Sequence, residues 1–153
     1  MERKGGSMAA FFCVHLTTEW LVPSKVEGRS SHMMPYQRLN AWRRCHQLAL
    51  VTYRVTQSFP KCELYGLTSQ MRRAAFSAPA NIAEGSAKRG PKEFRRFLDT
   101  ALGSLAELSY AILFVKELGY LSETDWKELD DLRSEAGKLT WGLYRLIFAR
   151  GTN

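Results

Sequence analysis

The chain has 153 residues, of which 45% are hydrophobic and 24% are charged. This is enough for one domain with a buried core and is ordinary for a soluble globular protein. The formal net charge is +7 and the pI is about 9.5, which favours an acidic partner such as nucleic acid. The longest wholly apolar run in the second half, residues 110–115, is far too short to span a bilayer, so we expect no membrane partner.

The positive charge is concentrated in one part of the chain. Residues 34–96 contain twelve Lys or Arg against three Asp or Glu, whereas residues 97–153 contain six against nine. A basic half joined to an acidic half fits a one-sided nucleic-acid surface. It fits equally a head-to-tail packing of identical subunits, so both interpretations stay open at this point.

Residues 1–33 differ from the rest of the chain, because they mix Gly, Ser, Pro and isolated apolar residues without a sustained period. The short apolar part from Met8 to Val14 soon meets His15 and Glu19, which is not the pattern of a signal peptide. We therefore expect a flexible N-terminal extension or leader over residues 1–33. A single folded domain is expected over residues 34–150.

The first helix is predicted over residues 39–58, with a turn at Pro60 and Lys61. Its core face combines two neighbouring stripes of apolar and small residues, as in a helix with a wide buried face. These stripes contain Trp42, Leu48, Ala49, Thr52, Tyr53, Val55, Thr56 and Phe59.

The second helix is predicted to start near Glu63 and to end at Gly85, where glycine takes a left-handed cap at little cost. Small residues between 74 and 83 let neighbouring helices approach closely. Pro79 lacks an N–H and clashes with the carbonyl four residues earlier, so a kink is predicted near Ala75. The core face contains Leu64, Leu67, Met71, Ala74, Ala75, Ala78 and Ile82.

Pro91 fits the first turn of a third helix, which is predicted to run to about Leu118 and to end at Gly119. Around residues 110–115 this helix is apolar nearly all round, so it must be buried on more than one side. Its main stripe contains Phe94, Phe97, Leu98, Ala101, Leu105, Leu108, Ile112 and Val115.

The fourth helix is predicted to begin after Ser122, because Ser122 and Asp125 resemble a capping box. Apolar residues then follow in steps of three and four, the seam spacing of packed helices. The seam contains Leu129, Leu132, Ala136, Leu139, Leu143 and Leu146. Four amphipathic helices with short loops predict an all-α fold, an antiparallel four-helix bundle with a kinked second helix.

A second apolar stripe on the fourth helix, Trp141, Tyr144 and Phe148, lies nearly opposite the leucine seam. Two opposed apolar faces on one helix are hard to satisfy in an isolated monomer. We expect another subunit to cover this stripe together with Leu113 and Phe114 of the third helix, so the protein is predicted to be a homo-oligomer. Coverage by the N-terminal segment is the alternative.

Catalysis and metal binding have little support in the sequence. His46 is the one histidine of the predicted domain, and the Glu-x-x-His pairs of a di-iron bundle and a phosphate-cradling glycine loop are both missing from the sequence. The three cysteines, Cys13, Cys45 and Cys62, are too few and too far apart for a zinc site. Their odd number without paired spacing indicates a reducing, cytoplasmic compartment. We therefore expect a protein that is not an enzyme and carries no metal or cofactor.

A basic cluster is the better candidate for function. Lys and Arg at roughly backbone spacing contact phosphates and confer affinity without reading sequence. The residues expected to bind nucleic acid first are Lys88, Arg89, Lys92, Arg95 and Arg96. We expect Arg72 and Arg73 to approach from the second helix, and Arg43, Arg44 and Arg54 to come from the first. A solvated rim that keeps the protein soluble is the alternative interpretation.

Several motifs fall in order along residues 36–121. They are YQRLNAW (36–42), FP (59–60), YGLTSQMRRAA (65–75), PANIAEG (79–85), KEFRRFL (92–98), GSLAEL (103–108) and LGYL (118–121). Together they resemble the bacterial four-helix bundle proteins that are encoded in intervening sequences of 23S ribosomal RNA genes. The resemblance implies an antiparallel bundle that assembles as a barrel-like homopentamer.

The resemblance also bears on function. Nucleic-acid binding is the usual proposal for these proteins, and a related branch comprises the accessory variability determinants of diversity-generating retroelements. Those similar bundles bind a reverse transcriptase and its template RNA. We therefore expect a non-catalytic, cytoplasmic, homo-oligomeric bundle that binds RNA or DNA through phosphates, with RNA favoured. The alternative is a protein–protein scaffold or an accessory subunit, for example of a reverse transcriptase.

Overall fold

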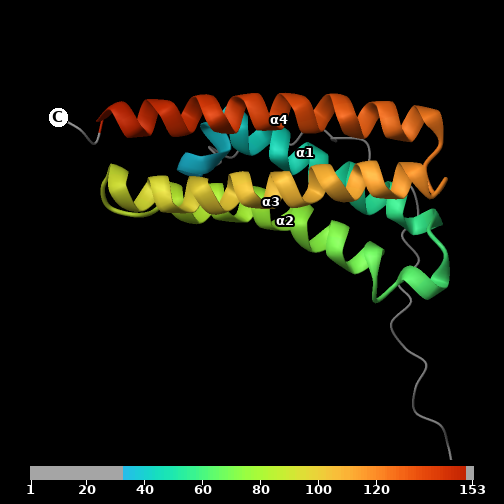
Figure 1. Ribbon diagram of the computed structural model, residues 1–153. Helices are drawn as coiled ribbons and strands as arrows, with labels where there is room; N and C mark the ends of the chain where they lie inside the picture. The colour runs from blue at the N-terminus through green and yellow to red at the C-terminus, as the bar shows by residue number, and fades with distance from the viewer. Residues whose placement is uncertain (1–32, 151–153) are drawn as a thin grey trace, which may run out of the picture. The chain divides into compact units, whose positions relative to one another are not determined.

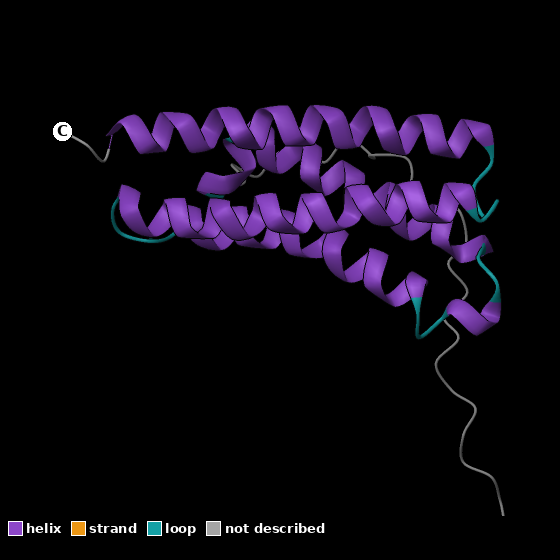
Figure 2. Ribbon diagram, in the orientation of Figure 1, coloured by secondary structure: helices purple, strands orange, loops and turns teal. Residues whose placement is uncertain are grey.

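The computed structural model describes residues 33–150, which form one all-α unit. Its four α-helices are α1 (Asn40–Val55), α2 (Leu67–Ser86), α3 (Pro91–Glu117) and α4 (Glu123–Arg150). Short 3-10 turns, η2 (Pro35–Arg38), η3 (Thr56–Ser58) and η4 (Lys61–Glu63), flank α1 and precede α2. Within residues 33–150 there is no strand (Figure 2). The prediction for residues 1–33 falls outside the described residues, apart from Met33.

Each helix packs mainly against two others, in the cyclic order α1, α2, α3, α4 and back to α1 (Figure 1). The all-α class and the four-helix bundle are therefore confirmed. The core lies on the common axis and draws large buried side chains from every helix. They include Leu48, Met71, Ile82, Leu98, Leu108, Ile112 and Leu129, all with at most 1% of their surface exposed.

Helix α3 contributes a long buried stripe to the core. Its predicted stripe is buried from Leu98 to Val115, and Phe94 packs against the core at its edge. By length and composition alone α3 contains an 18-residue window that is apolar enough to cross a membrane. In this structure 44% of that window is buried, and α3 packs against α2 and α4. A core helix passes such a test on composition as readily as a membrane span.

The ends of α3 and α4 follow local signals. Gly119 has a φ of 73°, and the N–H groups of Gly119 and Tyr120 donate to the carbonyls of Lys116 and Val115 at 2.9 and 3.0 Å. This is the Schellman arrangement that ends many helices. At the start of α4 the Ser122 hydroxyl accepts the Asp125 N–H at 3.1 Å and donates to the Asp125 carboxylate at 2.6 Å. The predicted cap is present, but Asp125 reaches the Ser122 hydroxyl rather than its backbone.

Several predictions for the first two helices are wrong in detail. Tyr53 and Leu64 are 44% and 49% exposed rather than in the core. Helix α2 begins at Leu67 rather than near Glu63, because the Glu63 carboxylate accepts the Leu67 N–H at 3.2 Å and thereby caps the helix from outside.

Gly85 does not end α2 through a left-handed conformation, because the positive-φ glycines of the described chain are Gly90 and Gly119. A Cβ at Gly85 would lie 2.7 Å from the Phe94 ring and 2.7 Å from the Phe97 Cβ. Glycine is therefore needed here for the close approach of α2 and α3, not for a turn.

Candidate nucleic-acid interface

The basic cluster lies at the turn between α2 and α3 and on the first turns of α3. Lys88, Arg89 and Lys92 are exposed, and Gly90 makes the turn with a φ of 94°, a conformation that favours glycine. Pro91 is the first residue of α3, where its missing N–H costs nothing. This end of the bundle therefore holds two cations on a short loop and a third on the first turn of α3.

Two acidic residues contact this cluster. Glu84 pairs with Lys88 at 3.1 Å, and Glu93 pairs with Arg96 at 3.7 Å. Both ion pairs are exposed and join residues one helical turn apart, so they contribute little to stability in water. Among the described residues no ion pair involves Arg89 or Lys92. Five cations against two carboxylates leave this end of the bundle positively charged.

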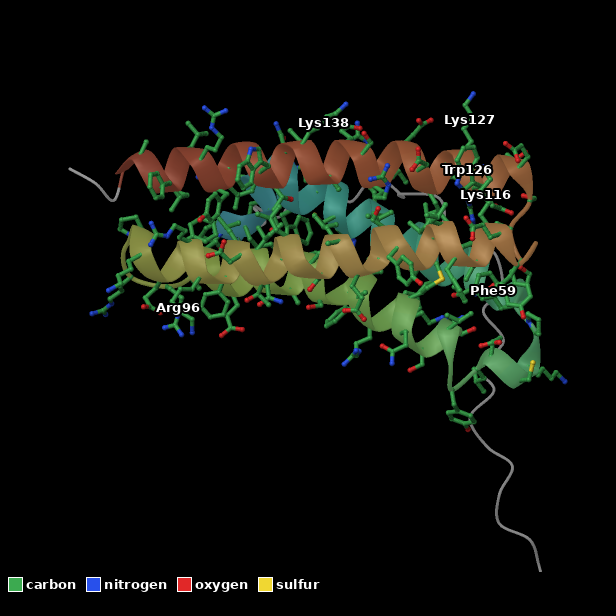
Figure 3. The ribbon with its side chains drawn as sticks, viewed as in Figure 1. Phe59, Arg96, Lys116, Trp126, Lys127 and Lys138 are labelled. Carbon is green, nitrogen blue, oxygen red and sulfur yellow. The ribbon has the colours of Figure 1, made fainter. Side chains whose placement is uncertain are left out.

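The two remaining members of the cluster differ in their surroundings. The Arg95 guanidinium lies 5.2 Å from the centre of the Phe148 ring, a cation–π contact that joins α3 to α4. Arg96 is more exposed and projects away from the bundle (Figure 3). Arg95 therefore holds two helices together, whereas Arg96 is directed toward solvent.

The structure does not bring Arg72 and Arg73 to this cluster. Arg72 lies fourteen residues before the end of α2 at Ser86, which is about 21 Å along a helix that rises 1.5 Å per residue. Its Nε donates to the Thr56 hydroxyl at 2.8 Å, and its guanidinium lies over the Tyr53 ring. Arg72 therefore joins α2 to the end of α1.

Arg73 and two arginines of α1 have acidic partners on neighbouring helices. Arg73 lies 3.4 Å from Glu107 of α3. Arg44 pairs with Glu135 of α4 at 2.8 Å, and Arg54 pairs with Glu128 and with Asp125. The contrast between a basic and an acidic half is therefore partly balanced inside one chain, away from the α2–α3 turn.

Helix α4 divides by charge along its length. Residues 123–135 contain six acidic residues and two basic ones, whereas residues 136–149 contain Lys138 and Arg145 and no acidic residue. The basic half of α4 lies at the same end of the bundle as the α2–α3 turn (Figure 1). That end therefore collects positive charge from two separate stretches of sequence.

The residues predicted to form an oligomer interface lie on α3 and α4. Trp141, Phe148 and Leu113 are 53%, 47% and 52% exposed, and Phe114 is 38% exposed. Tyr144 is half-buried and stacks on Trp141, with 5.3 Å between ring centroids. The apolar side chains needed for such an interface are thus at the surface of the single chain.

A second apolar surface was not predicted from the sequence. A groove of about 450 Å³ runs between α1 and α2, and the exposed side chains of Leu50, Tyr53 and Phe76 stand at its edge. Trp42 and His46 stack on each other in its wall, with ring centroids 4.9 Å apart. Leu50 and Phe76 fall outside the predicted core stripes of their helices. Large apolar residues on the outer faces of these two helices were the signal for the groove that the sequence offered.

The described residues offer little for catalysis. They contain no group of three or more His, Cys, Asp or Glu side chains that could hold a metal ion. Burial raises the pKa of the Cys45 thiol from 9.0 to about 11, against a smaller opposing effect of its contact with Thr140. Such a thiol is a poor nucleophile at neutral pH. The expectation that the protein is not an enzyme stays a prediction.

One protein family matches most of this chain. The family model described as 23S rRNA-intervening sequence protein covers residues 37–142. The chain belongs to this family. Membership in the 23S rRNA-intervening sequence proteins confirms the resemblance seen in the motifs. No curated protein matches the chain.

The family match spans η2 to most of α4 and therefore includes the whole basic cluster at the α2–α3 turn. It also includes Leu113, Phe114 and Trp141, and it ends before Tyr144 and Phe148. The relation to accessory variability determinants of diversity-generating retroelements stays a prediction.

Proposed function

We propose that this protein is a non-catalytic, cytoplasmic, homo-oligomeric bundle that binds RNA through phosphate contacts at its basic end. One observation carries the proposal. Arg44, Arg54 and Arg73 have acidic partners on neighbouring helices, whereas Arg89 and Lys92 are exposed and enter no ion pair among the described residues. Charge that is left uncompensated at one end attracts a polyanion from solution.

The local geometry suits phosphate groups. The cluster surrounds the N-terminus of α3, where the first backbone N–H groups have no partner within the helix and carry a partial positive charge. Gly90, the residue before the helix, supplies no side-chain cap. Lysine and arginine side chains together with a helix N-terminus form a common anion-binding arrangement. Such contacts bind the phosphate backbone and do not select a base sequence.

The antiparallel arrangement of the helices and the kink in α2 are part of the same proposal. An antiparallel arrangement is supported by contacts that run in opposite directions, since Arg54 meets Glu128 while Arg44 meets Glu135. A kink in α2 is supported by buried Pro79 inside the helix. The first half of α2 also departs from the line of its second half in Figure 1.

Homo-oligomerisation is supported by the two apolar surfaces. Exposed apolar residues of α3 and α4 form one of them, with Trp141 and Phe148 on the C-terminal part of α4 and Leu113 beside Trp126 near its start; the other is the groove between α1 and α2. These helix pairs are opposite sides of a four-helix bundle packed in cyclic order. Two different surfaces on opposite sides suit head-to-tail contacts, which form rings when the rotation between neighbouring subunits closes. The resemblance sets the proposed number at five.

The alternative is a protein–protein scaffold or an accessory subunit, for instance of a reverse transcriptase. It is favoured by the same exposed aromatic side chains, because tryptophan, tyrosine and phenylalanine are enriched where proteins meet. In this alternative a protein, rather than RNA, occupies the α2–α3 turn.

Paired charge reversals test the RNA proposal. We expect replacement of Arg89 and Lys92 by Glu to weaken binding of a generic fluorescent RNA by at least tenfold at low salt. The matched control replaces Lys61 and Lys127 by Glu, two exposed lysines without an ion pair among the described residues. Both variants change the net charge equally. Equal loss in the two variants would show a nonspecific charge effect and would remove the assignment to the turn.

A further inference from the structure

The C-terminal half of α4 extends past the helix that should cover it. Helix α1 has 16 residues and α4 has 28, or about 24 and 42 Å at 1.5 Å per residue. Cys45 contacts Thr140, so the beginning of α1 lies near residue 145 of α4. The turn η2 before α1 packs against α1 and α2. The last turns of the leucine seam are therefore left without a neighbouring helix on this side.

This uncovered part of α4 is a groove of about 650 Å³. Leu139 and Leu143 line it and are partly buried against the core of the same chain, whereas Leu146 is 64% exposed although the seam pattern predicted it for the core. The steps of four and three between these leucines give one half of a knobs-into-holes seam. The end of this seam at Leu146 is open to another helix.

The floor and the rim of the groove restrict what fits there. Ala41 and Gly142 line the floor, and a Cβ on Gly142 would meet nothing within 4 Å. Small residues let the backbone of a second helix come close. Lys138 and Arg145 also line the groove, and residues 136–149 contain no acidic side chain. The apolar floor is therefore bordered by positive charge alone on α4.

We propose that this groove is a docking site for an amphipathic helix of a protein partner, with an apolar stripe at heptad spacing and acidic residues beside it. The apolar stripe completes the seam of Leu139, Leu143 and Leu146, in the mode by which helices lie in hydrophobic grooves. The acidic residues meet Lys138 and Arg145, which provides specificity and orientation. This site is separate from the α2–α3 turn, and it does not depend on RNA binding.

The test uses the full chain and two synthetic peptides of about three heptads. Both carry leucine at the seam positions, and one has glutamate while the other has lysine at the flanking positions. We expect the glutamate peptide to bind at least tenfold more tightly than the lysine peptide, as measured by fluorescence anisotropy. Replacement of Lys138 and Arg145 by Glu should reverse this preference. Equal binding of both peptides, or binding of neither, would overturn the proposal.

A leucine substitution tests the apolar lining of the groove. Leu146→Ser should weaken binding of the glutamate peptide by at least tenfold without unfolding the protein, because Leu146 is largely exposed. Leu64→Ser, at an exposed leucine outside the groove, is the matched control and should leave binding unchanged. A lower mass of the Leu146→Ser variant in sedimentation would mean that a second copy occupies the groove, and that result would also overturn the proposal.

Discussion

The structural role of Gly85 is visible only from its packing against α3. From the sequence it is a helix-ending glycine, whereas in the structure it lets Phe94 and Phe97 of α3 approach the backbone of α2. Composition and local spacing do not report which side chain will lie opposite a glycine. The close approach was therefore beyond a prediction from sequence, although the small-residue character of α2 pointed to tight packing.

Gly85→Ala should destabilise the fold. The added methyl group would lie 2.7 Å from two phenylalanine carbons, so the helices must separate or the rings must move. Overpacking of this kind costs about 1–3 kcal/mol of unfolding free energy. Gly103→Ala on α3 is the control, since its Cβ would meet nothing within 4 Å and alanine favours a helix by about 0.5–1 kcal/mol. Denaturant unfolding of both variants measures the difference.

Cys45 gives a pH-dependent prediction. Its thiol is buried and its pKa is raised from 9.0 to about 11, chiefly by burial. Because the folded state holds this proton more tightly than the unfolded state, the thiol's contribution is fully present below pH 9 and is lost as pH rises through 11. The loss amounts to about 2–3 kcal/mol at 1.36 kcal/mol per pKa unit.

The Cys45→Ser variant isolates this effect, because serine keeps a hydroxyl near Thr140 and does not titrate. Chemical denaturation between pH 8 and about 11 should show a steeper decline for the natural chain than for the variant. Parallel declines in the two proteins would contradict the assignment to Cys45.

Cys62 is exposed, so it should react with iodoacetamide while Cys45 stays protected at neutral pH.

At the scale of elements, the sequence predicted what local signals determine. Pro91 and Gly119 set the bounds of α3 within one residue of the prediction, because a first-turn proline and a left-handed glycine act locally. The start of α2 was misplaced by four residues, because η4 and the Glu63 carboxylate occupy the expected first turn. Competing short-range structure of this kind has no clear signature in apolar periodicity.

Ser122→Ala should cost about 1 kcal/mol of unfolding free energy, because the hydroxyl caps the Asp125 N–H at the start of α4. The control is Thr124→Ala, an exposed residue in the same first turn. Thermal unfolding of the two variants provides the comparison. An equal stability of both would indicate that the cap contributes nothing beyond helix propensity.

At the scale of the whole molecule, the core stripe of α3 was predictable and the charge arrangement was not. The periodicity of α3 placed its buried residues correctly, because a helix in a bundle must bury its apolar face. The pairing of Arg44 and Arg54 with α4 depends on which helices become neighbours. The separation of Arg72 from the α2–α3 turn, in contrast, follows from its distance along α2. Apolar periodicity alone does not determine these long-range contacts.

The oligomer prediction belongs to this scale. Trp141→Ser together with Leu113→Ser should reduce the mass of the assembly in sedimentation, because both side chains are about half exposed on α3 and α4. Leu64→Ser and Tyr65→Ser, at two exposed apolar residues that precede α2 and lie outside that surface, are the control pair and should leave the mass unchanged. If the natural chain sediments as a monomer at micromolar concentration, the prediction of an oligomer interface is contradicted.

The central claim is that RNA binds through phosphates at the basic end of the bundle. The most direct measurement is a titration of fluorescent generic RNA with the full chain at several salt concentrations. We predict binding at low salt that weakens steeply as salt rises, with a log–log slope of about −0.7 per phosphate contact for a single strand. Absence of binding even at low salt would contradict the claim and would make the protein–protein scaffold the leading account.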